Sequence, residues 1–188
     1  KPIPPAKAEQ WALETFAKGK VPPFSFMLNS KPSIDFIRKW KHGLVKNASA
    51  NPDEIHYTAS YLDAAQKLQV ECKITVFTKF NSVDWVLHFT NEGSVNSGQI
   101  KSINAVDLGI QFPLANITNL YASEGSDHNV NDFRMQKYVL NNGDHRLMEP
   151  QSGRSSDKTA FPFFNIESEG KGGVIVAIGW TGTWFADV

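Results

Sequence analysis

The sequence predicts a mainly β protein built as an antiparallel sandwich, with one or two short helices near the N-terminus. From about residue 54 onward, apolar and polar residues alternate with a period of two, which is typical of strands with one buried face. Short polar turns join these stretches, and no helices alternate with them. This arrangement favours an antiparallel sandwich over a doubly wound parallel sheet.

The first fifty residues contain the expected helices. Residues 6–18 carry apolar side chains at helical spacing, with prolines before them and Gly19 after, which predicts an amphipathic helix. Residues 24–28 are expected to be extended. Residues 33–40 fit either a short helix capped by Ser33 or a strand, and the pattern leaves both open.

The remaining segments are mostly extended stretches. Alternate residues of 68–77 and 83–90 form one apolar face each, and the polar turn between them predicts an antiparallel pair. Cys72 lies on the first of these faces, and we expect a buried small hydrophobe there rather than a reactive thiol. Residues 174–180 are almost continuously apolar, which predicts a fully buried strand. The expected strands are 55–62, 68–77, 83–90, 99–112, 133–140, 145–148 and 174–180.

Composition limits the classes of function. The chain has 188 residues, 41% of them hydrophobic, which predicts a single domain over residues 1–188. Nineteen basic residues balance nineteen acidic ones, so we expect neither nucleic acid nor a membrane surface as a partner. The single cysteine excludes a disulfide framework. The chain begins at Lys1 without an initiator methionine, which fits a processed protein, and we expect a secreted or periplasmic location.

Several residue patterns that could indicate cofactor or metal chemistry lie at the wrong positions or spacings for it. Gly170, Gly172 and Gly173 precede a strand, whereas a phosphate-binding loop follows a strand and opens a helix, so we expect a hairpin turn there. The five histidines lack the spacing of a helical zinc site, and no Gly-x-Ser-x-Gly motif exposes a serine nucleophile. We therefore expect no metal and no cofactor.

The segment from Asp127 to Asp132 begins like a calcium-binding loop, with oxygen-bearing side chains at alternate positions. Its sixth position is Asp132, where the sharp turn needs a glycine, and its twelfth is Tyr138, where a bidentate glutamate belongs. These departures favour an ordinary polar loop over a calcium site.

Two long polar loops, residues 125–133 and 152–165, carry side chains that hydrogen-bond hydroxyl groups. Among them are Asp127, Asp132 and Arg154. Planar polar groups of this kind bind sugars when an aromatic ring covers the apolar face of the pyranose. The structural alternative is that these charges are solvated or connect the loops. Asp127 and Asp132 are also close enough in sequence to be a carboxylate pair, but nothing nearby distinguishes an acid from a base.

Two tryptophans near the C-terminus could supply the aromatic ring. Trp180 ends the apolar stretch at 174–180, so we expect it in the core. Trp184 follows Gly182 and is the better candidate for exposure.

Six motifs follow one another along the chain: PPFSFMLNSKPS (22–33), VDWVLHFTNEGS (83–94), INAVDL (103–108), YASEGSDHNVNDF (121–133), SGRSSDKTAFPFFN (152–165) and GGVIVAIGWTGTW (172–184). In this order they resemble the N-terminal domain of alpha-galactosidase-like (melibiase-type) glycoside hydrolases. The matches cover nearly the whole chain from residue 22, and the last two are the most specific.

The resemblance implies a β-supersandwich of the galactose-mutarotase type, followed in the same polypeptide by a (β/α) barrel with the two catalytic aspartates of a retaining mechanism. This chain stops at Val188, so we expect it to be non-catalytic, with the barrel as its partner and an edge or apolar face left uncovered. The candidates for the rim of the sugar site or for the domain interface are Asp127, Asp132, Phe133, Arg154, Trp180 and Trp184.

Two other functions stay open. The polar loops and Trp184 also fit a free-standing carbohydrate-binding module, with a galactoside-type carbohydrate as ligand. A sugar epimerase would share the sandwich and would use a general acid and base, commonly His and Glu. His88 and His145 both fall in expected strands, but neither matches a mutarotase motif.

Overall fold

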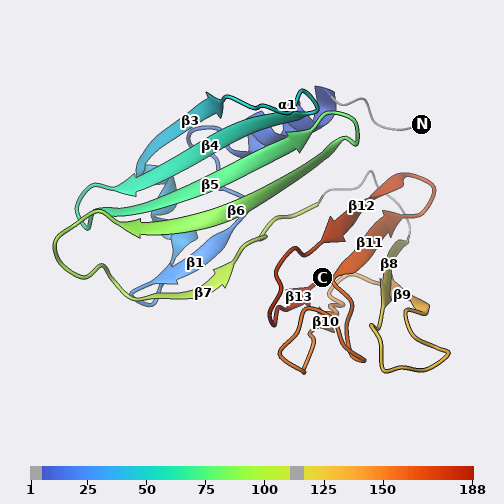
Figure 1. Cartoon of the computed structure of the whole chain (residues 1–188). Helices are drawn as coiled ribbons and strands as arrows, with labels where there is room; N and C mark the ends of the chain where they lie inside the picture. The colour runs from blue at the N-terminus through green and yellow to red at the C-terminus, as the bar shows by residue number, and fades with distance from the viewer. Residues whose placement is uncertain (1–5, 111–116) are drawn as a thin grey trace. The chain divides into compact units, whose positions relative to one another are not determined.

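The structure is a computed structural model that describes residues 6–110 and 117–188 (Figure 1). It divides into two compact units, which we name unit 1 (Lys1–Gly109) and unit 2 (Ile110–Val188) and describe separately. The described strands pair antiparallel throughout, which confirms a mainly β, antiparallel fold with short helices. The single-domain organisation of residues 1–188 stays a prediction.

Unit 1 contains a four-stranded sheet in the order β3-β4-β5-β6 and a three-stranded sheet in the order β2-β1-β7. The elements are α1 (Ala6–Thr15), β1 (Ser25–Leu28), β2 (Lys31–Pro32), η1 (Ser33–Asp35), η2 (Ile37–Lys39), β3 (Lys41–Asn47), β4 (Glu54–Asp63), β5 (Leu68–Phe77), β6 (Ser82–Asn91) and β7 (Ile100–Asn104). The helix expected over residues 6–18 is present but ends at Thr15, and the strands expected over 24–28, 55–62, 68–77 and 83–90 are present. The strand expected over 99–112 forms only as the shorter β7, and its residues 111–112 lie outside the described residues.

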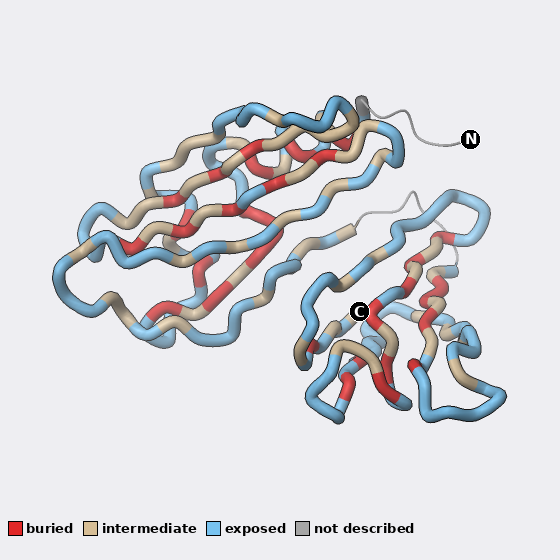
Figure 2. Tube along the Cα trace, in the orientation of Figure 1, coloured by how far each residue is buried: buried red, intermediate tan, exposed pale blue. Residues whose placement is uncertain are grey.

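The core of unit 1 lies between the four-stranded sheet and the elements that cover one of its faces. Helix α1 contributes Ala8, Ala12 and Phe16, and β1 contributes Phe26 and Leu28. The facing positions of β4 and β5 are buried at every second residue, as the tube in Figure 2 shows. Cys72 is fully buried on this face, which confirms the sequence expectation.

Residues 33–40, for which helix and strand were both open, form two short 3₁₀ turns, η1 and η2. Ser33 does not cap a helix. It is buried, and its Oγ accepts a hydrogen bond from the Phe26 backbone N–H at 3.2 Å. The segment therefore closes over β1 as a turn, with Ile37 in the core.

Unit 2 contains a four-stranded sheet in the order β12-β11-β8-β9 and a two-stranded sheet formed by β10 and β13. The strands are β8 (Thr118–Ser123), β9 (Met135–Leu140), β10 (Leu147–Met148), β11 (Phe163–Ser168), β12 (Gly172–Ala177) and β13 (Ala186–Asp187). The expected strand at 133–140 begins only at Met135, and the one at 145–148 only at Leu147. The expected hairpin turn joins β11 to β12 and has Gly170 at φ +70°, a conformation that favours glycine.

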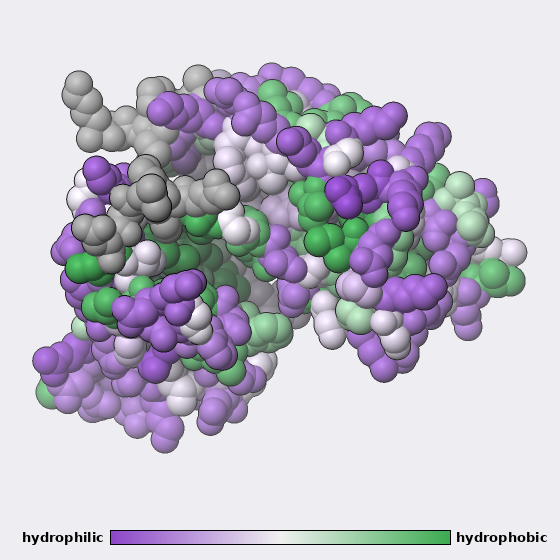
Figure 3. All heavy atoms as spheres, turned by 180° about the vertical axis from the view of Figure 1, so that it is seen from behind, coloured by the Kyte–Doolittle hydropathy of each residue, from purple (hydrophilic) through white to green (hydrophobic). Residues whose placement is uncertain are grey.

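The prediction of a fully buried strand at residues 174–180 was wrong. Among the described strands, β12 pairs only with β11, so it forms an edge of the sheet. Ile175 is 78% exposed and Val174 37% exposed, while Val176 packs against the core. Exposed large apolar side chains occur in both units, and Figure 3 shows hydrophobic residues on the surface among hydrophilic ones. Within the described part of the chain, no helix has the length and apolar character to cross a membrane.

Candidate functional site

The loop between β8 and β9 is organised by the Asp132 carboxylate. Its two oxygens accept hydrogen bonds from the backbone N–H groups of Asp127 and His128 at 3.0 Å each and from the Ser126 hydroxyl at 2.6 Å. The backbone bond from Asp127 is the main cause that lowers the pKa of Asp132, and the Ser126 hydroxyl adds to it. These bonds occupy the oxygens that a calcium ion would need. Within the described residues, no three His, Cys, Asp or Glu side chains cluster as metal ligands.

Asp132 and Phe133 are adjacent, but their side chains have different surroundings. Phe133 is 52% exposed, and its ring meets Phe161 edge to face at a centroid distance of 5.3 Å. Phe161 in turn lies 5.3 Å from Phe163, which is also half exposed. We name Phe133, Phe161 and Phe163 the aromatic cluster. It is an apolar patch beside a polar loop.

The remaining sequence candidates do not converge on one site. Asp127 and Arg154 are exposed, and no hydrogen bond of either side chain is found among the described residues. The expectation for the two tryptophans was the reverse of what is found. Trp180 is 66% exposed, because β12 is an edge strand that ends at Ala177.

Trp184 is 7% exposed and belongs to the core of unit 2. Its indole Nε1–H donates a hydrogen bond of 2.7 Å to the Ser155 carbonyl oxygen. A buried indole needs such an acceptor, so the bond fixes the loop at residues 152–160 against the end of the chain.

Asp157 organises that same loop and was not singled out from the sequence. It is 7% exposed, and its Oδ2 accepts backbone N–H bonds from Gln151 and Ser152 at 2.7 Å each. Its Oδ1 accepts from the Thr159 N–H at 2.8 Å. Burial acts to raise the pKa of Asp157, but the hydrogen bonds from Thr159 and Ser152 outweigh it and lower the pKa strongly. The Asp-x-Thr spacing is a signal of such a turn.

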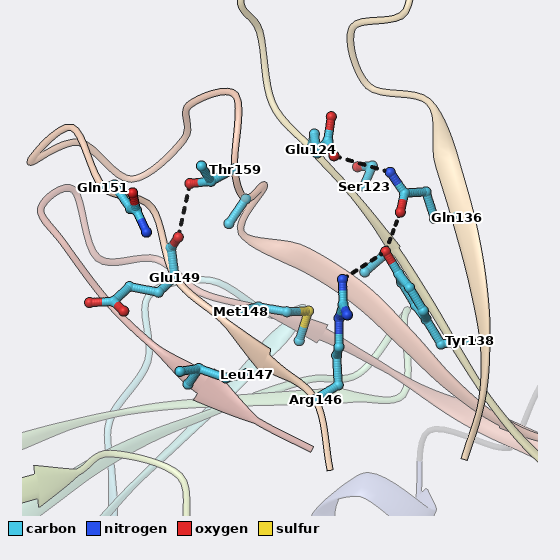
Figure 4. Close-up of a pocket in the computed structure, with 12 residues that line it drawn as sticks. Ser123, Glu124, Gln136, Tyr138, Arg146, Leu147, Met148, Glu149, Gln151 and Thr159 are labelled. Carbon is cyan, nitrogen blue, oxygen red and sulfur yellow. Dashed lines mark hydrogen bonds between the residues drawn. The ribbon is translucent and has the colours of Figure 1, made fainter. Parts of the chain in front are cut away.

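Unit 2 contains a pocket of about 240 Å³ between the β8–β9 edge of the sheet and the segment that leads through β10 (Figure 4). Its lining residues come from β8 and the loop after it, β9, the β10 segment and the end of the Asp157 loop. They are Ala122, Ser123, Glu124, Gln136, Tyr138, Arg146, Leu147, Met148, Glu149, Gln151, Thr159 and Ala160.

Four of the lining side chains form a continuous hydrogen-bonded chain, which we name the polar wall: Glu124, Gln136, Tyr138 and Arg146. Arg146 Nη2 donates to the Tyr138 hydroxyl at 3.1 Å, and its guanidinium carbon lies 4.2 Å from the centre of the Tyr138 ring. The Tyr138 hydroxyl donates to Gln136 Oε1, and Gln136 Nε2 donates to Glu124 Oε1 at 3.2 Å. Because a guanidinium can only donate and a carboxylate can only accept, the two ends of the chain fix the direction of every bond in it.

Comparisons with solved structures identify proteins of similar fold. The chain is similar to the GH36 alpha-galactosidase AgaA from Geobacillus stearothermophilus in complex with raffinose (TM-score 0.60, 16% identity, 89% of this chain). It is also similar to AgaB from the same organism (TM-score 0.59, 16% identity, 90% of this chain) and to the alpha-galactosidase from Lactobacillus brevis (TM-score 0.56, 14% identity, 89% of this chain). No protein-family model and no curated protein matches the sequence.

This chain covers only 24% of each of these three enzymes. At 14 to 16% identity the likeness concerns the fold and not the residues of a site. The chain therefore has the fold of a segment that makes up about a quarter of a GH36 alpha-galactosidase.

Proposed function

We propose that this chain is the non-catalytic N-terminal domain of an alpha-galactosidase-like glycoside hydrolase and that it packs on the catalytic barrel of the same polypeptide. The observation that carries the proposal is the fold match, which extends over 89% of this chain but only 24% of the AgaA enzyme. The order of the sequence motifs supports it independently. The Asp127 and Asp132 pair gives no support to catalysis, because Asp132 is engaged by the backbone of its own loop.

The aromatic cluster is the surface best suited to this role. Phe133 and Phe163 are each about half exposed, and aromatic residues are enriched where proteins contact partners. Arg154 and the Asp132 loop supply polar groups in the same unit. We infer that this face contributes to the barrel interface or to the rim of the sugar site.

Kinetics of the longer polypeptide test this inference. We expect Phe133→Ala or Phe163→Ala to weaken the contact between this face and the barrel, and so to raise KM for an alpha-galactoside or to lower Tm. Phe80→Ala is the matched control, because Phe80 is 77% exposed in a turn of unit 1. If the three variants have the same KM and Tm, the aromatic cluster has no such role.

The other two functions differ in their support. A free-standing carbohydrate-binding module is the second candidate, and the pocket of unit 2 is the observation that favours it. The epimerase has less support, because neither His88 nor His145 matches a mutarotase motif. Export of the protein stays a prediction, which cell fractionation would test.

A further inference from the structure

We propose that the pocket of unit 2 binds one neutral, polyhydroxylated ring of the size of an aldohexose. The pocket is formed entirely by residues of unit 2. The proposal does not depend on the presence of a catalytic barrel or on the role of the aromatic cluster.

The size of the pocket favours a small ligand. Its volume of about 240 Å³ lies just below the range of about 300–1,000 Å³ that is usual for sites of drug-sized ligands. An oligosaccharide would extend far beyond it. A single pyranose or a similar polyol matches this volume.

The polar wall supplies both donors and acceptors. After the bonds within the wall are counted, Gln136 Nε2 keeps one N–H, Arg146 keeps further N–H groups and Glu124 keeps its second carboxylate oxygen. A sugar hydroxyl donates one hydrogen bond and accepts others, so it can use neighbouring groups of both kinds. An anion such as phosphate, whose oxygens are mostly acceptors, would be repelled by the charge of the Glu124 carboxylate.

The wall has a balanced charge. The Arg146 cation stands at one end of the chain of hydrogen bonds and the Glu124 carboxylate at the other, and both are held in place by Gln136 and Tyr138. Glu149, whose side chain points away from the wall in Figure 4, adds a negative charge to the lining. Neutral ligands are therefore favoured over uronates and phosphates.

The floor of the pocket is apolar. Ala122, Met148 and Ala160 are each less than 9% exposed and belong to the core of unit 2. A pyranose has C–H groups on its faces and hydroxyls around its edge, so an apolar floor next to a polar wall complements it.

The side of the pocket opposite the wall is preorganised. Thr159 Oγ lies 2.9 Å from the Glu149 carbonyl oxygen and 2.5 Å from Asp157 Oδ1. Asp157 also holds the Gln151 backbone N–H at 2.7 Å. Because these contacts are made within unit 2 itself, a ligand need not supply them, which lowers the entropic cost of binding.

Backbone chemical shifts of the ¹⁵N-labelled chain, titrated with D-galactose, D-glucose, D-galacturonate and inorganic phosphate, test the proposal. We expect saturable shifts at residues 122–124, 136–138 and 146–151 with a neutral hexose, and at least about tenfold weaker binding of galacturonate and phosphate. Gln136→Leu removes the middle of the wall at similar volume, and we expect it to weaken hexose binding about tenfold or more.

Arg146→Lys is the second variant, because it keeps the charge but loses the planar contact with the Tyr138 ring. Gln66→Leu is the matched control, since Gln66 is an exposed residue in a turn of unit 1. Each variant is compared only if its spectrum shows a folded chain. The proposal is overturned if neutral hexoses up to tens of millimolar shift no pocket resonance, or if phosphate or galacturonate binds as tightly as the neutral hexoses. It is also overturned if folded Gln136→Leu and Arg146→Lys both bind hexose with the affinity of the control.

Discussion

The indole N–H of Trp184 donates a hydrogen bond of 2.7 Å to the carbonyl oxygen of Ser155, 29 residues earlier in the chain. This bond connects the last strand region of unit 2 to the loop that Asp157 organises. Trp184 is buried in the core of unit 2, so it stabilises structure and is not an exposed sugar platform.

The two tryptophans predict a clear contrast in stability. Trp184→Phe removes the buried N–H donor and part of the core, and we expect the free energy of unfolding to fall by about 1–3 kcal/mol. Trp180→Phe is the same substitution at a side chain that is 66% exposed, and we expect a change within about 0.5 kcal/mol. Urea unfolding followed by circular dichroism measures both. Equal losses for the two variants would contradict the assignment of Trp184 to the core.

The lowered pKa of Asp157 predicts that the folded chain loses stability in acid. Its pKa is lowered in the folded chain below the value of about 3.9 for an unperturbed aspartate. The stabilisation is therefore fully present above about pH 5 and is lost as the pH falls below 4 towards the folded pKa. We expect Asp157→Asn to be less stable at pH 7 and to lose less stability than the parent chain between pH 5 and pH 2. Asp127→Asn, at an exposed position, is the control, and a parallel pH profile for both variants would refute the prediction.

The backbone around Gly125 leaves no room for a side chain. A Cβ added there would lie 2.6 Å from the Asp157 carbonyl oxygen, which is backbone, and close to the Ser156 hydroxyl. The Gly125 N–H also donates to that carbonyl at 2.7 Å. We expect Gly125→Ala to lower Tm by several degrees, whereas Gly179→Ala, with open space around it, should leave Tm nearly unchanged. Equal Tm values for the two variants in scanning calorimetry would show that the loop at Asp157 shifts to accommodate the added Cβ.

The burial of Cys72 predicts that thiol reagents modify it slowly in the folded chain. The side chain is fully buried on β5, and burial raises the pKa of its thiol. At pH 8 we expect a thiol reagent to modify Cys72 at a rate limited by opening of unit 1, and to modify it at once in guanidinium. Modification at the same rate in both conditions would mean that the β5 face is open.

Strands β4, β5 and β6 of unit 1 could be predicted because a half-buried strand shows alternating apolar and polar residues in its own sequence, whereas β3 was not predicted. Leu68, Val70 and Cys72 show it directly. The continuous apolar run at 174–180 carries no such signal. Whether it forms a central or an edge strand depends on which strands pair with it, and this is decided by contacts distant in sequence.

The pocket could not be predicted for a similar reason. Its polar wall needs the register of β8 on β9, in which Ala122 pairs with Gln136, and the return of Arg146 beside Tyr138. Individual glutamates and glutamines in a sequence do not indicate this arrangement. The Asp157 turn, in contrast, has a local spacing from which it could have been found.

The most direct test of the proposed non-catalytic role is the hydrolysis of an aryl alpha-galactoside by the purified chain of residues 1–188, compared with the longer polypeptide to which we propose it belongs. We expect turnover by the longer polypeptide and none by this chain at equal concentration. Hydrolysis by residues 1–188 alone, abolished by a substitution within these residues, would contradict the proposed function.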